Sequence, residues 1–250
     1  MLGLSQKRMS QITCVGKSDA GLKRSNNEDA FVVNAELGLC LLADGMGGAA
    51  AGELASRIFT EKALYIFSES DIRSEKEALK LAQRAFSSAN EGILDHVAEQ
   101  PHHKGMGCTA ELIAFRNGSF VLGHVGDSRT YRLRKEELKL LTQDHSLVQD
   151  QVNKGLITLE EARTHSLKNV ILRAVGIENS LAVDFIRGKT RPHDLFLLCS
   201  DGLTDMIDDT AIQEVLLSVI SLSQKVENLI ELAKSAGGYD NITVVLAEIV

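Results

Sequence analysis

Apolar residues recur along the chain with two different periods, and the changes of period predict where strands and helices lie. Short apolar runs that are bounded by polar residues predict β-strands at 12–15, 31–33, 39–43, 130–133, 138–141, 183–186, 195–199 and 242–249. The runs 111–115 and 120–125 predict a β-hairpin, because the Asn117-Gly118 pair between them suits a two-residue turn.

Helical spacing begins after Gly48, where apolar residues recur on one face as far as Phe67. A second long helix is predicted to start at a capping box of Ser74 and Glu77, and its apolar face continues to Val97. Two later helices are predicted at 210–219 and 224–235.

The segment 145–176 differs from the rest of the chain. It is polar and lacks a long apolar face, and it has only short helical signals, such as the cap formed by Thr158 and Glu161. We therefore predict a flap on the scaffold. Elsewhere strands come in clusters and helices in pairs, which favours an α+β layered sandwich over a doubly wound parallel sheet.

Composition narrows the class of protein. The 250 residues suit one large domain or two small ones, and 44% hydrophobic residues can fill a sizeable core. No Pro-rich linker or repeat marks a boundary between domains. Lys plus Arg is 27 and Asp plus Glu is 34, so the formal charge is 27 − 34 = −7. This balance argues against a general nucleic-acid binder.

The cysteines and the apolar segments indicate the compartment. Cys14, Cys40, Cys108 and Cys199 lie singly in apolar stretches, so we expect buried thiols in a reducing compartment and no zinc site of the paired-cysteine type. No segment has the length of a signal peptide core or a membrane span. We expect a cytoplasmic protein without membrane partners, and a monomer, because no heptad pattern is present.

Five short motifs carry the candidate chemistry, and most of them place an aspartate beside glycine. They are RSNNED at 24–29, ADGMGG at 43–48, VGDSR at 125–129, CSDG at 199–202 and GGYDN at 237–241. A single Asp-Gly pair usually marks a turn. The combination is harder to explain in that way.

Asp44 and Asp201 each end an apolar strand, so their carboxylates would emerge at one edge if those strands are neighbours. Together with Asp240 they would repel one another strongly unless a cation lay between them. Oxygen ligands without a Cys/His cluster point to a hard ion, Mg²⁺ or Mn²⁺. Glycine lets the backbone approach closely, so the carbonyl of Gly45 is a further candidate ligand.

With these motifs in this order, the chain resembles the metal-dependent Ser/Thr protein phosphatases of the PPM (type 2C) family, in their compact bacterial form. The resemblance covers residues 11–250 and leaves residues 1–10 as an N-terminal extension. It implies a four-layer α-β-β-α sandwich, in which two central antiparallel sheets are flanked by helix pairs. The family's variable flap corresponds to about 145–176.

The resemblance also implies a ligand set for two Mn²⁺ or Mg²⁺ ions. Asp44 would bridge both ions, and the Gly45 carbonyl would bind one of them. Asp201 and Asp240 would hold the other ion. Asp127 matches a position that helps to form a third, weaker metal site in bacterial members.

Four further residues take roles from the same resemblance. Glu28 would act mainly through a metal-bound water, with Asp29 supporting it. Arg24 would bind the substrate phosphate, since a planar guanidinium matches two phosphate oxygens. Asn241 would orient the neighbouring Asp240.

The resemblance implies hydrolysis of phosphoserine and phosphothreonine in proteins, by direct attack of a metal-bridging hydroxide. The partners would be phosphorylated proteins and a cytoplasmic Ser/Thr kinase that the enzyme opposes. Two alternatives stay open. One is a catalytically silent, metal-binding regulatory domain of the same fold, and the other is a small-molecule phosphatase.

One position departs from many eukaryotic members, which have a histidine proposed as general acid where this chain has Met46. Methionine cannot donate a proton, so the general acid is unassigned, and a metal-bound water is the simplest candidate. His145 and His165 are expected to be solvated loop residues. Cys108 is expected to pack in the core.

Overall fold

The computed structural model describes residues 12–48, 51–72 and 74–250. The predicted N-terminal extension, residues 1–10, therefore lies outside the described residues. Within them, no helix is long and apolar enough to cross a membrane.

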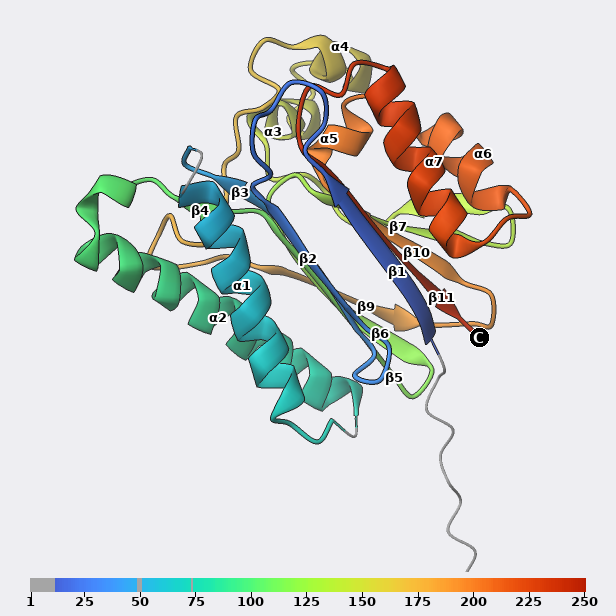
Figure 1. The fold of residues 1–250 in the computed structure, drawn as a ribbon, viewed down its shortest axis with the longest axis horizontal. Helices are drawn as coiled ribbons and strands as arrows, with labels where there is room; N and C mark the ends of the chain where they lie inside the picture. Colours follow the sequence, from blue (N-terminus) through green and yellow to red (C-terminus); the bar gives the residue numbers. More distant parts are fainter. Residues whose placement is uncertain (1–11, 49–50, 73) are drawn as a thin grey trace, which may run out of the picture.

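Two antiparallel sheets form the centre of the molecule (Figure 1). The first has the strand order β1-β11-β10-β7-β8, with bounds Ile12–Asp19, Ile242–Ile249, Leu195–Cys199, Arg129–Arg134 and Glu137–Leu140. The second has the order β2-β3-β5-β6-β9, and β4 pairs with β3 beside it. The bounds in that sheet are Asp29–Asn34, Leu39–Met46, Ala110–Arg116, Ser119–Val125 and Asp184–Lys189, with Gly107–Cys108 for β4.

Helices cover the outer face of each sheet, and Figure 1 shows the two pairs on opposite sides of the molecule. The long helices α1 (Ala51–Ser68) and α2 (Glu75–Glu99) pack on the second sheet. On the first sheet lie α6 (Asp209–Leu217) and α7 (Leu222–Ser235). The α+β layered class and the α-β-β-α order are thus confirmed.

Alternation along β3 shows how one strand serves two cores. Leu39 and Leu41 pack toward α1 and α2, whereas Cys40 and Leu42 belong to the cluster between the sheets. Side chains of successive strand residues point to opposite faces, so a strand buried on both faces needs a continuous apolar run. A third core lies between the first sheet and helices α6 and α7.

The predicted hairpin turn and the predicted start of the second long helix are both present in the structure. Asn117 and Gly118 have φ of +49° and +71°, as a tight hairpin turn requires. The hydroxyl of Ser74 accepts a hydrogen bond from the amide of Glu77 at the start of α2.

Three short elements have no counterpart in the predicted pattern. They are the 3₁₀ helix Pro101–His103, the two-residue strand β4 and the one-turn helix α5 (Asp201–Thr204). Each is too short to show a hydrophobic period. Strands β1 and β3 also run past their predicted ends, because polar residues and glycine continue the pairing, as Asp19 does with Ile242 and Gly45 with Cys108.

The flap lies between β8 and β9 and contains two short helices, α3 (Leu147–Asn153) and α4 (Leu159–Thr164). Figure 1 shows both at one end of the sheets. The predicted cap at Thr158 is a complete capping box with Glu161. The end of the flap is joined to β4 by antiparallel backbone hydrogen bonds between Val175 and Cys108, of 2.9 and 3.0 Å.

Asn90 of α2 also fastens the end of the flap. This residue is only 3% exposed, and its Oδ1 accepts a hydrogen bond from the Gly176 amide at 2.7 Å. Its Nδ2 donates to the Glu178 carbonyl at 2.9 Å. Both polar ends of a buried side chain are therefore used to hold the flap against the scaffold.

Substituting Asn90→Ala leaves both backbone partners without a hydrogen bond. We expect the free energy of unfolding to fall by about 2–3 kcal/mol, since a buried unsatisfied group costs about 1–3 kcal/mol. Urea denaturation measures the change. The control is Lys80→Ala on the exposed side of the same helix, for which a change below about 0.5 kcal/mol is expected. If the two substitutions lowered the free energy of unfolding equally, the role of Asn90 in holding the flap would be contradicted.

Candidate metal centre

Asp44 and Asp201 come from different sheets and meet where the strands end. Asp44 lies in β3, opposite Asp29 of β2, and Asp201 begins α5 directly after β10. Burial raises the pKa of Asp44 well above its usual range, and the charges of Asp29, Asp201, Asp127 and Asp240 raise it further. These neighbours show that the five carboxylates converge on one region.

Asp201 has the same electrostatic character. Burial raises its pKa well above the usual range, and the charges of Asp127, Asp205 and Asp240 add to that. Like charges shift a carboxyl in this direction because each disfavours the ionised form of the other. A divalent cation would relieve both the burial and the repulsion.

Several carboxylate oxygens of this group have no hydrogen-bond partner. Oδ1 atoms of Asp29, Asp127 and Asp201 are buried and unsatisfied. Carboxylate oxygens are the ligands that Mg²⁺ and Mn²⁺ prefer, so the donor set fits a hard cation. Among the described residues, no three acidic, His or Cys side chains form a complete ligand group. Backbone carbonyls and water would therefore have to complete the coordination.

Glycine is required where Gly45 crosses the start of α1. A Cβ on Gly45 would lie 2.1 Å from the carbonyl oxygen of Gly52 and 2.6 Å from that of Glu28. A Cβ on Gly52 would lie 1.8 Å from Oε2 of Glu28. No side chain fits at either position. The two glycines thus let the Glu28 carboxylate and the Gly45 backbone come close together.

Asp29 connects the two sheets beneath the carboxylates. Its Oδ2 accepts hydrogen bonds from the hydroxyls of Ser200 at 2.9 Å and Thr243 at 2.5 Å, both from the first sheet's side. Burial raises its pKa to about 6, although both hydroxyls favour the ionised form. Neutral donors thus support a carboxylate without adding a competing cation.

Asn241 anchors the loop that carries RSNNED. Its side-chain amide donates to the carbonyls of Ala20 and Asn26, and its Oδ1 accepts from the amide of Glu28 at 2.8 Å. Its backbone amide, rather than its side chain, donates to Oδ1 of Asp240 at 2.8 Å. One residue therefore links the loop to Asp240.

Arg24 and Asp240 form an ion pair at the rim of the site. Nη2 of Arg24 lies 2.7 Å from Oδ2 of Asp240, and the guanidinium is about half exposed. Its hydrogen bond to Asp240 raises the pKa of Arg24. Arg24, the candidate phosphate-binding residue, is therefore in direct contact with Asp240, a candidate metal ligand.

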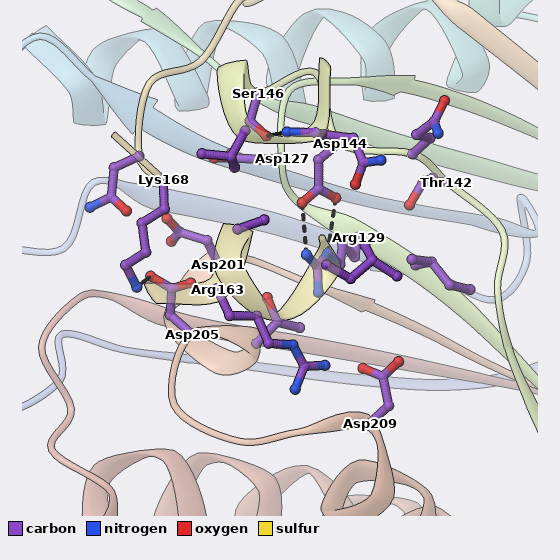
Figure 2. Close-up of a pocket in the computed structure, with 18 of the residues that line it drawn as sticks. Asp127, Arg129, Thr142, Asp144, Ser146, Arg163, Lys168, Asp201, Asp205 and Asp209 are labelled. Atoms are coloured by element: carbon purple, nitrogen blue, oxygen red, sulfur yellow. Dashed lines mark hydrogen bonds and ion pairs between the residues drawn. The ribbon is translucent and has the colours of Figure 1, made fainter. Parts of the chain in front are cut away.

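A pocket of about 640 Å³ adjoins two of these carboxylates (Figure 2). Asp127 and Asp201 line it, together with residues of the flap and of the 204–209 segment. Figure 2 shows Lys168 of the flap reaching Asp205, at 2.6 Å. The other candidate residues lie outside this lining, so the pocket extends from one side of the carboxylate group.

Thr109 holds the backbone of Asp44, a role that sequence reasoning missed. Its Oγ1 accepts from the Asp44 amide at 3.1 Å, and its own amide donates to the Asp44 carbonyl at 2.9 Å. The same Oγ1 shares a 2.7 Å hydrogen bond with the hydroxyl of Ser128, next to Asp127. In the sequence, Thr109 lies in the stretch GMGCTA at 105–110, which carries no acidic residue to draw attention to it.

Two expectations about side-chain environment have different outcomes. Cys108 is fully buried, as expected, and burial raises the pKa of its thiol. The expectation of a solvated His145 was wrong, because that residue is 8% exposed. It is buried because its ring packs on the ring of His124, with centroids 4.6 Å apart. His165, in contrast, is partly exposed.

The chain is similar to known protein phosphatases over most of its length. The family model described as Protein phosphatase 2C matches residues 20–241. Serine/threonine protein phosphatase PstP of Mycobacterium tuberculosis is 39% identical over 249 residues, covering 97% of this chain and 46% of PstP. The chain thus spans about half of that relative. Protein phosphatase PhpP of Streptococcus pneumoniae is 36% identical over 232 residues, covering 92% of this chain and 94% of PhpP.

Solved structures show the same fold. A PstP catalytic domain in complex with two manganese ions aligns with a TM-score of 0.88 at 37% identity, covering 97% of this chain and 100% of that domain. Serine/threonine phosphatase Stp1 of Staphylococcus aureus aligns with a TM-score of 0.91 at 30% identity, covering all of both chains.

The raised pKa values predict how stability depends on pH in the presence of EDTA. Burial raises the pKa of Asp29 to about 6 and that of Asp127 to about 7. An ordinary aspartate has a pKa of about 4. These carboxyls therefore favour the folded state below about pH 4, and this contribution is lost as the pH rises through their folded values. We expect the free energy of unfolding to fall by roughly 4 kcal/mol from about pH 5 to about pH 8, as measured by urea denaturation.

Asp201→Asn tests the repulsion within the carboxylate group, because it removes a charge that raises the pKa of Asp44. In EDTA at about pH 8 we expect the variant to be more stable than the native protein. Saturating Mn²⁺ should reverse the order, since the native carboxylates bind the ion better. The exposed control, Asp95→Asn, should behave like the native protein in both buffers. If the variant stayed more stable than the native protein in saturating Mn²⁺, a metal site at Asp201 would be contradicted.

Proposed function

This chain belongs to the protein phosphatase 2C family, and we propose that it hydrolyses phosphoserine and phosphothreonine in proteins with the help of divalent cations. The observation that carries the proposal is the convergence of buried carboxylates from two sheets, with unsatisfied Oδ1 atoms on Asp127 and Asp201. A relative of the same fold carries two manganese ions, which supports Mn²⁺ or Mg²⁺ as the cofactor.

Asp44, Asp201, Asp240 and the carbonyl of Gly45 are the proposed ligands of two ions, and Asp127 is the proposed ligand of a third. Two ions of this kind, when bound, activate water for attack on phosphorus and offset the negative charge of the phosphate. Glycine at position 45 supports the use of its backbone carbonyl, because the close approach of Gly52 leaves no room for a side chain there.

The chain's own residues then orient the reacting groups. Glu28 is held by Asn26 and Asn241, so its carboxylate stays beside Gly52. We assign it to the orientation of water, with Asp29 fixing the strand that follows. Arg24 leaves Asp240 to bind the phosphate of the substrate. Its half-exposed position at the rim supports that exchange.

A phosphorylated polypeptide is favoured over a small metabolite by the similarity to PstP and PhpP, whose names describe protein phosphatases. A pocket extends from Asp127 and Asp201. Its volume of about 640 Å³ gives room for residues next to the phosphorylated one. The silent regulatory domain is disfavoured, because every candidate ligand and the candidate phosphate arginine are in the chain. The enzyme would act as a cytoplasmic monomer opposing a Ser/Thr kinase.

Hydrolysis of p-nitrophenyl phosphate and of a phosphothreonine peptide tests the proposal directly. The native protein should be active with Mn²⁺ and inactive in EDTA. Asp201→Asn should lower kcat/KM by at least about 100-fold, the usual effect of removing one electrostatic contact to a transition state. Asp95→Asn should retain activity. If native protein that is folded and loaded with Mn²⁺ hydrolyses neither substrate, the proposed phosphatase activity is refuted.

Arg24→Ala tests the phosphate contact separately. We expect KM for the peptide to rise about 10-fold, because a charge-assisted hydrogen bond contributes about 1.5 kcal/mol or more. Lys23→Ala changes the adjacent exposed cation and should leave KM nearly unchanged. Similar effects of the two substitutions would mean that Arg24 acts only through general charge.

A further inference from the structure

A buried acid–base pair lies beside the candidate metal centre, and the proposed chemistry does not use it. Glu111 of β5 and His124 of β6 are directly opposite each other in the second sheet, and both are 0% exposed. Oε1 of Glu111 is hydrogen-bonded to Nδ1 of His124, and Oε2 accepts from the hydroxyl of Thr130 in the other sheet.

The hydrogen bonds of His124 define where its protons lie. Nε2 is 2.9 Å from the carbonyl oxygen of Gln143, which can only accept, so Nε2 carries a proton. A second proton lies between Nδ1 and Glu111. Burial alone would lower the pKa of His124, but Glu111 raises it to about 9. The pair is therefore neutral as a whole, and it holds the start of the flap through Gln143.

His145 packs on this pair and binds the loop that carries Asp127. Its ring lies 4.6 Å from that of His124. Its amide donates to the Gly126 carbonyl at 2.7 Å, and its Nδ1 accepts from the Gly126 amide at 3.1 Å. Nδ1 therefore carries no proton. Burial and the charge of His124 lower the pKa of His145 to about 4, which keeps the ring neutral.

The other nitrogen of this ring faces the flap and β9. Nε2 of His145 lies 3.1 Å from Nη1 of Arg173 and 3.3 Å from Oδ2 of Asp184. Arg173 also pairs with Asp184, at 3.2 Å. The two ring nitrogens thus have separate partners. Only Nδ1 contacts the loop that carries Asp127.

Asp127 depends on its neighbours for its orientation. Its side chain is 7% exposed, and its Oδ1 has no hydrogen-bond partner. On one side Gly126 is bonded twice to His145, and on the other the hydroxyl of Ser128 is bonded to Thr109. These two contacts fix the backbone on both sides of Asp127, from which its carboxylate projects.

We propose that His145, supported by the buried Glu111–His124 pair, is a positioning residue that aims Asp127 at a divalent cation through the reciprocal hydrogen bonds with Gly126. The inference rests on the proposed function, in which Asp127 is a metal ligand. It assigns to His145 no contact with substrate and no proton transfer.

Two substitutions of His145 separate the roles of its nitrogens. In His145→Asn the amide oxygen can take the place of Nδ1 and accept from the Gly126 amide. In His145→Gln the amide extends to the place of Nε2, so the Gly126 contact is lost. Both variants lose the ring contact with His124. A purely structural role for the ring therefore predicts equal effects, whereas positioning through Nδ1 predicts a difference.

Calorimetric titration with Mn²⁺ provides a readout independent of activity. The part of Mn²⁺ binding that depends on Asp127 is the difference between the titration of the native protein and that of Asp127→Ala. We expect His145→Gln to weaken that part about 10-fold and His145→Asn to weaken it less than about 3-fold, with similar thermal unfolding midpoints for the two. Equal Mn²⁺ affinities in the two variants, or an Asp127→Ala protein that binds Mn²⁺ like the native one, would overturn the inference.

A measurement on native protein covers the case in which neither His145 variant folds. Titration with Mg²⁺ should shift the amide proton resonance of Gly126, and Asp127→Ala should abolish the shift. An unmoved resonance would overturn the inference. Native protein that binds no divalent cation and shows no phosphatase activity would refute the proposed function as well. Active, Mn²⁺-binding protein with equal Asn and Gln variants would refute only the role of His145.

Discussion

Repulsion between buried carboxylates is the constraint on which the candidate metal centre depends. Asp44 and Asp201 sit at the ends of strands from two different sheets, and burial together with the charges of neighbouring aspartates raises the pKa of both. Such a cluster opposes folding. The apolar layers on both faces of β3 supply the opposing stabilisation, because they bury its residues on both sides and hold the sheets together beneath the carboxylates.

The groups around the carboxylates are mostly neutral. Hydroxyls of Ser200 and Thr243 support Asp29, and Thr109 supports the backbone of Asp44. A lysine or arginine in those places would neutralise the acids and compete with a metal ion. Arg24 is the cation that pairs with Asp240, and it stands at the exposed rim, where it can exchange partners. Neutral donors therefore leave the buried carboxylates without a competing cation, whereas the positive charge of Arg24 lies at the exposed rim.

Sequence alone predicted the residues whose role follows from local pattern. Asp44 and Asp201 were recognisable because an aspartate that follows a buried apolar run must emerge at a sheet edge. His145 was not recognisable, because a polar loop gives no sign that its ring will pack on His124, 21 residues earlier, and bind Gly126. The two-residue strand β4 had no period to detect. Contacts between segments that are distant in sequence, rather than local propensities, determine both the burial of His145 and the formation of β4.

The flap is attached to the segments around the candidate metal ligands by contacts of unequal strength. Its first end is held by the buried pair of hydrogen bonds between His145 and Gly126, and its last end by the backbone ladder between Val175 and Cys108. In between, Lys168 and Asp205 are each about one third exposed, and an ion pair of that kind contributes little. The two ends are therefore the stiff parts of the flap. We therefore expect the segment over the pocket to move relative to Asp205 more readily than the two ends move relative to Gly126 and Cys108.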